Sequence, residues 1–349
     1  MSETKPHRKL LLVGPTNGSV HVRNYYHLVK AYFDDVLIVT MNPVDFCKYE
    51  IVDFSIKNPL TVFKKTRRIR QIIETYRPDV IHVHQANSVA YLTCRANRLN
   101  IPLVLTCWGS DVLLLPQMGK MYRHIVKYAL RKSTVVTADA HYMADAIYQL
   151  GEKKEVIIVN FGIDFDTSLV IPPKENYIYS NRLHKDVYNI ETIVLAFAAF
   201  VKSHPDWKLI IGAVGDNTDK LKKLASEKLP ENSFEFIGFV DAAENQKYYL
   251  KSRIWVSIPS SDGTSISLLE AMGYGCIPVV SDLPANKEWI THGKNGLIAE
   301  NTLVKTLEQA IHLNLAEVQK VNRQIIIEKG TREINRTVFL EIYNSILKR

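Results

Sequence analysis

The feature that most constrains the fold of this chain is a regular alternation of short apolar segments with amphipathic ones, which runs through most of its 349 residues. In the first half, runs of Val, Ile and Leu alternate with segments whose apolar residues recur at helical spacing. The strands expected here are residues 9–14, 36–40, 49–54, 78–84, 102–107, 134–138 and 155–160. Strands that alternate with crossover helices form a mainly parallel sheet covered by helices on both faces. The first half is therefore predicted to be a doubly wound α/β domain.

The alternation breaks at residues 161–174, which contain Gly162, two acidic residues, Pro172 and Pro173, a composition typical of a linker. It then resumes, with strands expected near residues 177–180, 207–212, 234–237, 253–258, 277–281 and 296–298. A chain of this length usually forms more than one core. We predict two Rossmann-like domains, residues 1–165 and 166–331, with a last helix at about 332–349 that returns to the first domain.

The net charge of +8 is unevenly distributed. Residues 1–170 hold 22 Lys and Arg against 15 Asp and Glu, whereas residues 171–349 hold 22 against 21. A basic first half favours an anionic partner such as a membrane surface, a lipid phosphate or nucleic acid. Two expected helices, at 60–76 and 119–132, carry much of this charge and would suit anionic lipid, unless they pack on the sheet with solvated cations. No nucleic-acid partner is expected, because the basic residues lack interleaved aromatics and a known module.

The cysteines and the apolar runs indicate the compartment. Four cysteines stand singly, which favours a reducing environment and disfavours a structural zinc site. The longest apolar run, residues 192–201, is half the length of a membrane span, and the polar, basic start of the chain does not resemble a signal peptide. A cytoplasmic protein is expected.

Residues 257–280 combine a strand, a small polar loop, a helix and a second strand. Backbone N–H groups at the start of such a helix favour phosphate, because the helix dipole is positive there. Asp262 lies in the loop and Glu270 lies two turns into the helix. An anion seat flanked by two carboxylates suits a sugar nucleotide. The alternative is an ordinary strand–helix junction with a capping Asp and a surface Glu.

Five segments resemble, in the same order, those of the retaining glycosyltransferases of family 4, or group 1, which have the GT-B fold. They are Thr106-Cys-Trp-Gly-Ser-Asp111, Val159-Asn-Phe-Gly-Ile-Asp164, Phe236-Ile-Gly-Phe-Val240, residues 259–280 and His292-Gly-Lys-Asn-Gly-Leu297. Each segment is weak alone, but the five together span nearly the whole chain. The resemblance implies two Rossmann-like domains that face a central cleft, with the acceptor on the first and the nucleotide sugar on the second.

The resemblance also implies roles for residues of the second domain. Backbone N–H groups of four consecutive residues would hold the donor diphosphate: Gly263, Thr264, Ser265 and Ile266. Glu270 would hold the ribose hydroxyls, and Phe239 would contact the nucleotide. Asp262 stands where the family has a Glu, so its contact with the donor sugar is made by a carboxylate one methylene shorter.

The family places an Arg and a Lys after the first strand of the second domain, where they neutralise the leaving diphosphate. Such cations are needed because breaking the sugar–phosphate bond builds negative charge on the leaving group. Arg182 matches the first position, Tyr188 falls near the second, and Lys185 lies three residues earlier. Arg182 and Lys185 are the expected cations, with a solvated loop lysine as the alternative for Lys185.

In the first domain, Gly18 lies in a loop that resembles the family's flexible loop beneath the donor. Asp111 would lie near the transferred sugar or the acceptor hydroxyl, unless it only caps its loop. Trp108 stands where many relatives have a His, so no imidazole base is expected there. His82 and His84 are expected to point to opposite faces of their strand, with His84 either lining the cleft or buried for structural reasons.

The resemblance implies a retaining hexosyl- or N-acetylhexosaminyltransferase that uses a UDP-sugar, or else a GDP-sugar. The expected acceptor is a lipid-diphosphate-linked sugar in bacterial polysaccharide synthesis, at the inner face of the cell membrane. No metal is expected to be required: Asp164-Phe-Asp166 lies in the linker, and no other cluster has metal-ligand spacing. One alternative is a catalytically silent GT-B partner or regulatory protein, which Asp262 and Tyr188 favour. A GT-B epimerase or phosphorylase is less well supported.

Overall fold

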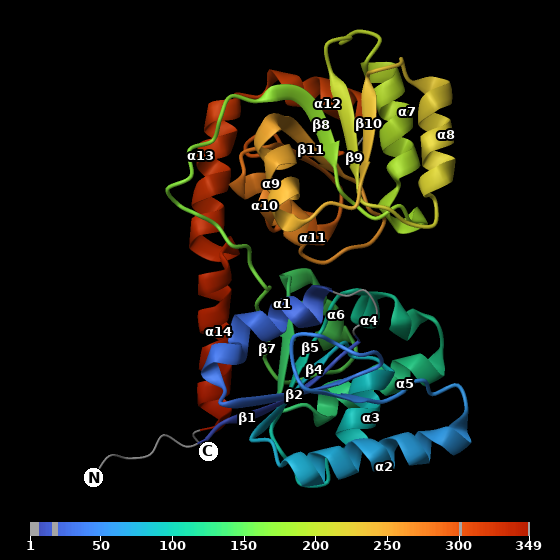
Figure 1. The fold of residues 1–349 in the computed structure, drawn as a ribbon, viewed down its shortest axis with the longest axis vertical. Coiled ribbons are helices and arrows are strands. Elements are labelled where there is room, and N and C mark those ends of the chain that lie inside the picture. Colours follow the sequence, from blue (N-terminus) through green and yellow to red (C-terminus); the bar gives the residue numbers. More distant parts are fainter. Residues whose placement is uncertain (1–6, 16–19, 300–301, 348–349) are drawn as a thin grey trace. The chain divides into compact units, whose positions relative to one another are not determined.

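In the computed structural model of the chain, residues 7–15, 20–299 and 302–347 are described. The chain divides into two compact units: unit 1 comprises Met1–Phe161 and Arg332–Arg349, and unit 2 comprises Gly162–Thr331. Each unit is a parallel sheet with helices on both faces (Figure 1). The predicted pair of doubly wound α/β domains is therefore confirmed. None of the described helices is both long enough and apolar enough to cross a membrane.

The sheet of unit 1 has seven strands in the order β3-β2-β1-β4-β5-β6-β7, and every described pair is parallel. The strands are β1 (Lys9–Val13), β2 (Asp35–Thr40), β3 (Tyr49–Ile51), β4 (Val80–His84), β5 (Leu103–Thr106), β6 (Val135–Ala138) and β7 (Val156–Ile158). Each lies where an apolar segment predicts a strand. Because all strands run the same way, the loops that follow them meet at one edge of the sheet.

The helices of unit 1 include the three predicted at 60–76, 119–132 and 332–349, with small differences at their ends. The helices are α1 (Val20–Val29), α2 (Pro59–Tyr76), α3 (Ser88–Ala96), α4 (Ser110–Leu113), α5 (Lys120–Lys132), α6 (His141–Gln149) and α14 (Arg332–Leu347). Helix α4 lies in a segment that reads as a loop, because a single turn is too short to produce apolar periodicity. Gly109 precedes it with a φ of 107°, a backbone conformation that favours glycine.

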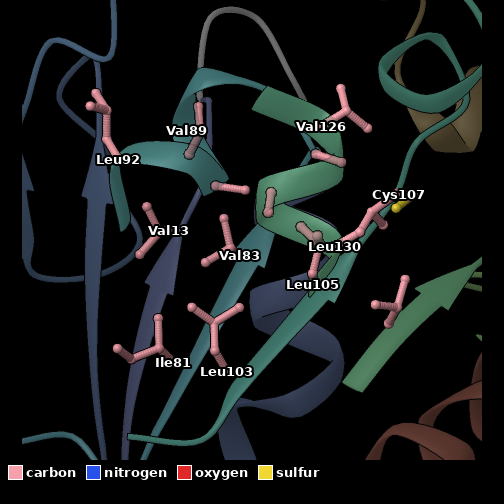
Figure 2. Packing of buried hydrophobic residues seen from close by; sticks show 14 of the residues in the cluster. Val13, Ile81, Val83, Val89, Leu92, Leu103, Leu105, Cys107, Val126 and Leu130 are labelled. Atoms are coloured by element: carbon pink, nitrogen blue, oxygen red, sulfur yellow. The ribbon is translucent and has the colours of Figure 1, made fainter. Parts of the chain in front are cut away.

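Alternation along the strands of unit 1 builds two cores, one on each face of the sheet. Figure 2 shows side chains of the first core, in which strand residues such as Val83 and Leu105 point toward Val89 of α3 and Val126 of α5. The second core lies under α1 and α14, the C-terminal helix, whose Phe339 is fully buried there. The last helix thus belongs to unit 1.

The sheet of unit 2 has six strands in the order β10-β9-β8-β11-β12-β13, again with every described pair parallel. The strands are β8 (Glu175–Ser180), β9 (Lys208–Gly212), β10 (Phe234–Gly238), β11 (Ser252–Ser257), β12 (Ile277–Ser281) and β13 (Leu297–Ala299). The helices are α7 (Ile190–Phe200), α8 (Thr218–Lys228), α9 (Ala242–Lys251), α10 (Ile266–Gly273), α11 (Pro284–Lys287), α12 (Leu303–His312) and α13 (Leu315–Ile325). Strands β8 and β11 are neighbours at the centre of the sheet, so the loops that follow them lie side by side.

Candidate functional site

The loop between β11 and α10 leads into a helix N-terminus that no side chain caps. Ser265 precedes the helix with an extended backbone (φ −75°, ψ 122°), and no side-chain cap bond forms there. Gly263, Thr264 and Ser265 are buried. The first N–H groups of a helix have no partner within the helix, and the helix dipole gives them partial positive charge. The start of α10 therefore favours an anion such as phosphate.

Arg182 lies directly over this helix start. Its Nη2 pairs with Asp262 Oδ2 at 2.6 Å, and its Nη1 donates a hydrogen bond to Ser265 Oγ. Arg182 follows β8 and its partners follow β11, so the contact depends on those strands being neighbours. The side chain of Arg182 is only 10% exposed, compared with 24% for Asp262. The two partners hold the guanidinium in one orientation beside the uncapped N-terminus.

Asp262 thus has a role that its sequence position does not reveal. The sequence predicts that Asp262 contacts the donor sugar and that Arg182 contacts the diphosphate, as separate groups. In the structure their side chains form one ion pair, and Asp262 Oδ1 also accepts the Gly263 N–H at 3.1 Å. The contact of Asp262 with a donor sugar stays a prediction.

Tyr188, which occupies the position expected for a lysine, supports Arg182. The Arg182 Cζ lies 4.5 Å from the centroid of the Tyr188 ring, within the range of a cation–π interaction. Lys185 lies between them in the chain, but its side chain is exposed and makes no ion pair with a described residue. The structure therefore places Arg182, and not Lys185, at the start of α10.

Glu270 is held by a partly buried polar network that the sequence does not reveal. Its Oε2 accepts hydrogen bonds from the Tyr249 hydroxyl at 3.0 Å and from Asn245 Nδ2 at 3.3 Å. Asn181 Nδ2 donates to the same hydroxyl at 2.8 Å, and Trp255 Nε1 donates to Asn181 Oδ1 at 2.9 Å. Burial, and then the charge of Glu270, raise the pKa of Tyr249 well above its usual value. The hydroxyl therefore stays protonated and orients the half-buried carboxylate.

Phe239 lies apart from this group of residues. It follows β10, the edge strand, which β9 and β8 separate from β11. Its side chain is 77% exposed. Phe239 and Arg182 thus both follow the carboxyl ends of strands in this sheet, but Phe239 is not in contact with Arg182.

In unit 1, Asp111 joins two loops. Its Oδ2 accepts the Ala86 N–H at 2.6 Å, in the loop after β4, and its Oδ1 accepts the Trp108 N–H at 3.0 Å, in the loop after β5. The residue is 3% exposed. Burial raises the pKa of Asp111, whereas the backbone N–H groups oppose that shift because they stabilise the carboxylate. Both carboxylate oxygens thus hold the two loops together through hydrogen bonds. A contact of Asp111 with the acceptor or the transferred sugar stays a prediction.

A cavity of about 420 Å³ lies beside Asp111. Its lining combines polar groups, including Gln85, Asn87 and Ser110, with apolar side chains such as Met118, which is 69% exposed. Few polar groups in a partly apolar cavity are typical of a small-molecule site. Gly18, the other residue expected on this side, lies outside the described residues.

The expectation that His82 and His84 point to opposite faces is wrong. The centroids of their rings lie 4.9 Å apart, and the rings stack with an interplanar angle of 12°. Residues two apart on a strand point to the same face of the sheet. His84 is fully buried, and its Nδ1 accepts a hydrogen bond from Trp108 Nε1 at 3.1 Å. Burial lowers the pKa of His84 to about 3, so the ring is neutral. His84 is a buried residue of the core and does not line an open site.

Comparisons with known proteins identify relatives of both units. A family model described as "Glycosyl transferases group 1" matches residues 164–331, and one described as "Glycosyl transferase 4-like" matches residues 9–140.

Among the described residues, no group of three or more His, Cys, Asp or Glu side chains is placed to hold a metal ion.

Two curated relatives are similar to parts of the chain. Poly(glycerol-phosphate) alpha-glucosyltransferase of Bacillus subtilis (strain 168) is 28% identical over 200 residues, which are 56% of this chain and 29% of that protein. This chain thus spans less than a third of that relative's length. Alpha-monoglucosyldiacylglycerol synthase of Acholeplasma laidlawii is 28% identical over 286 residues, which are 73% of this chain and 70% of that protein.

Solved structures match nearly the whole chain. Anabaena Alr3699/HepE in complex with UDP and glucose has a TM-score of 0.81 at 16% identity, and the match covers 97% of this chain and 100% of that one. Sucrose-phosphate synthase from Thermosynechococcus elongatus has a TM-score of 0.79 at 13% identity, and the match covers 98% of this chain and 99% of that one. Likeness at such low identity establishes the fold.

Proposed function

The chain belongs to the group 1 glycosyltransferases and has the GT-B fold, and from this premise we propose that it transfers a sugar from a nucleoside-diphosphate sugar to a sugar acceptor. The proposed donor is a UDP-sugar, with a GDP-sugar as the second candidate. We propose that unit 2 binds the donor, that unit 1 binds the acceptor, and that the sugar is a hexose or an N-acetylhexosamine transferred with retention of configuration.

The observation that carries this proposal is the position of Arg182. Asp262 and Ser265 hold its guanidinium beside the uncapped start of α10. A diphosphate bound there would meet one fixed cation and several backbone N–H groups. As the sugar–phosphate bond breaks, negative charge grows on the leaving group, and donors that are already oriented stabilise that charge most effectively. Lys185, exposed in the same loop, would add its charge when the donor is bound.

Glu270 and Phe239 complete the proposed donor site. Glu270 would accept hydrogen bonds from the ribose hydroxyls, in the orientation that Tyr249 and Asn245 impose on its carboxylate. Phe239 is an exposed aromatic ring at the same edge of the sheet, where it could stack on a base. Residues 263–266 would contact the diphosphate through their N–H groups, that of Gly263 after leaving Asp262 Oδ1, to which it donates in the structure.

On the acceptor side, we propose a sugar carried by a lipid diphosphate, at the cytoplasmic face of a membrane. The cavity beside Asp111 offers polar groups for the sugar and apolar side chains for the adjoining lipid. Two relatives are named for poly(glycerol-phosphate) and for a diacylglycerol, which supports an acceptor that is anionic or lipid-linked. The basic surface of the first half of the chain supports a peripheral position on an anionic membrane.

Donor binding is tested by thermal unfolding of the whole chain with a panel of UDP-, GDP-, ADP- and dTDP-sugars. At a concentration of about 100 Kd the matching donor is expected to stabilise unit 2 by about 2.7 kcal/mol. For a unit of this size that raises the Tm by about 5 °C or more. Slow release of nucleoside diphosphate should accompany binding. If no sugar nucleotide raises the Tm, the proposal fails; if one binds but is neither hydrolysed nor transferred, the catalytically silent alternative is favoured.

Tyr249→Phe is expected to weaken donor binding about tenfold, because a hydrogen bond to a charged group contributes about 1.5 kcal/mol or more. Isothermal titration with the donor measures the change in Kd. Tyr248→Phe is the matched control: Tyr248 is the neighbouring residue on α9, and its ring stacks on Tyr179. Equal Kd values for the two variants would contradict the proposed role of Glu270.

A further inference from the structure

Unit 1 contains a second, larger cavity at the opposite edge of its sheet from Asp111. Its volume is about 890 Å³, and residues of α2, of the end of α3 with the loop that follows it, and of the end of α5 line it. Leu103 and Thr134, at the starts of β5 and β6, also line it. Asp111 follows the other end of β5. The cavity is therefore distinct from the proposed acceptor site.

The lining of this cavity carries four cations and no carboxylate. The cations are Arg70, Arg95, Arg98 and Lys132. None of them forms an ion pair with a described residue, whereas two other cations of α2, Lys65 and Arg68, pair with Asp53 and Glu50 at 2.7 Å.

The side chains of two of these arginines are partly fixed by the protein around them. Arg70 Nε is buried and has no hydrogen-bond partner among the described residues, so this end of the guanidinium is enclosed by protein. Arg95 Nη1 donates to the Tyr91 hydroxyl at 3.1 Å, and its guanidinium lies 5.5 Å from the centroid of that ring. The cavity therefore presents partly fixed donors and not only mobile surface cations.

Helix dipoles do not neutralise this charge. Helices α3 and α5 end beside the cavity, and each helix C-terminus carries about half a negative charge. Two such ends supply about one unit of negative charge against four full positive charges. The excess remains positive, which favours an anion with more than one acceptor oxygen.

The rim of the cavity indicates where that anion comes from. Phe63 lines the cavity and is 71% exposed, and Leu60, one turn earlier on α2, is 83% exposed. Exposed apolar side chains next to unpaired cations are typical of surfaces that lie on anionic membranes, where the cations meet phosphates and the apolar groups enter the interface. A small soluble anion would make no use of Phe63 and Leu60.

We propose that this cavity binds the phosphate of an anionic phospholipid headgroup, with Arg70, Arg98 and Lys132 around the phosphate and Phe63 inserted beside the acyl chains. The proposal rests on the membrane partner proposed above and names the place of contact. Such a cavity holds unit 1 on the bilayer through a specific lipid and not through diffuse charge alone.

The test compares two charge-matched double variants of the full chain. Arg70→Gln with Arg98→Gln removes two cations from the cavity, and Lys64→Gln with Arg67→Gln removes two exposed cations of α2 that do not line it. Co-sedimentation with vesicles of phosphatidylglycerol and phosphatidylcholine measures the affinity, with pure phosphatidylcholine as the neutral reference. Loss of two hydrogen bonds to a charged phosphate, at about 1.5 kcal/mol or more each, is expected to weaken binding of the cavity variant by more than about a hundredfold. The control variant is expected to lose at most the diffuse attraction of two surface cations, about thirtyfold.

Each outcome has one interpretation. A larger loss in the cavity variant, with unchanged binding to neutral vesicles, supports the proposal. Equal losses in the two variants mean diffuse attraction and overturn the cavity site but not the membrane partner; no binding to anionic vesicles overturns both. A rise in Tm with inorganic phosphate, without vesicle binding, would assign the cavity to a soluble anion. The single variant Arg98→Gln, at an exposed position, serves if the double variant does not fold. Vesicle binding requires no activity, so all these results leave the glycosyltransferase proposal untouched.

Discussion

Replacing Arg182 with alanine is expected to lower the kcat of sugar transfer by about a hundredfold to a thousandfold, the usual cost of removing one oriented donor from a site where charge develops. The guanidinium lies at the start of α10, between Asp262, Ser265 and the ring of Tyr188. No other described cation is held at that position. The effect should fall mainly on kcat, because the charge on the diphosphate grows only as the bond to the sugar breaks.

Steady-state kinetics of nucleoside diphosphate release, with and without acceptor, measure this effect. Lys185→Ala is the comparison variant: it removes the exposed cation of the same loop, which makes no ion pair with a described residue, so a smaller loss of kcat is expected. Arg182→Lys should recover only part of the rate, because a lysine keeps the charge but cannot contact Asp262 and Ser265 with two separate nitrogens. A variant Arg182→Ala with normal kcat, or a loss equal to that of Lys185→Ala, would contradict the assignment.

The ion pair with Asp262 requires a further variant. Removing Arg182 leaves the Asp262 carboxylate unpaired beside the anion seat, where it would repel a diphosphate. The double variant Arg182→Ala with Asp262→Ala removes that repulsion. If the rate loss comes mainly from the missing cation, the double variant should remain nearly as slow as Arg182→Ala; recovery to near the normal rate would assign the loss to the unpaired carboxylate.

Replacing Phe339 with alanine is expected to lower the free energy of unfolding of unit 1 by about 3–5 kcal/mol, because the change removes a large side chain from a packed core. Phe339 is fully buried, and its ring lies 4.9 Å from that of Tyr25, nearly perpendicular to it. The neighbouring Tyr343 donates or accepts hydrogen bonds with Tyr25 and His82. These contacts join α14 to the sheet across more than 200 residues of intervening sequence.

Chemical denaturation followed by circular dichroism measures this loss. Glu341→Ala is the control, because Glu341 lies on the exposed side of α14 and should change the free energy of unfolding by no more than about 0.5 kcal/mol. A loss below about 1 kcal/mol for Phe339→Ala would mean that α14 contributes little to the stability of unit 1.

Most strands of both sheets could be predicted from the sequence because they are buried on two faces; the edge strand β3, with Tyr49 and Ile51 exposed, is an exception. Such strands form continuous runs of Val, Ile and Leu, as in β1 and β2, and these runs are separated by polar segments. Short elements carry no comparable pattern. Helix α4 has four residues, and η1 (Lys30–Tyr32) continues α1 as a 3-10 turn, so neither could be distinguished from its surroundings by periodicity.

The residues of the candidate site could be predicted only in part. The loop and helix at 257–280 indicate an anion site by their local composition, and a resemblance added Arg182 from a distant segment. The sequence did not indicate that Asp111 bonds two loops through both of its oxygens. Nor did it indicate Tyr249 and Asn245, since a tyrosine and an asparagine on α9 have no spacing that relates them to a carboxylate on α10.

What the sequence determined by itself is local: the alternation of strands and helices, the break near residue 161, the excess of positive charge in the first half and the loop and helix start at 262–266 where an anion is expected to bind. The tertiary structure decided which side chains meet. Arg182 pairs with Asp262, 80 residues away, because β8 and β11 are neighbours, and four cations from separate segments gather in one cavity because α2, α3 and α5 pack on one face of the sheet. Residue spacing fixes the periodicity of an element, but the order of strands, which brings distant loops together, depends on how whole elements pack.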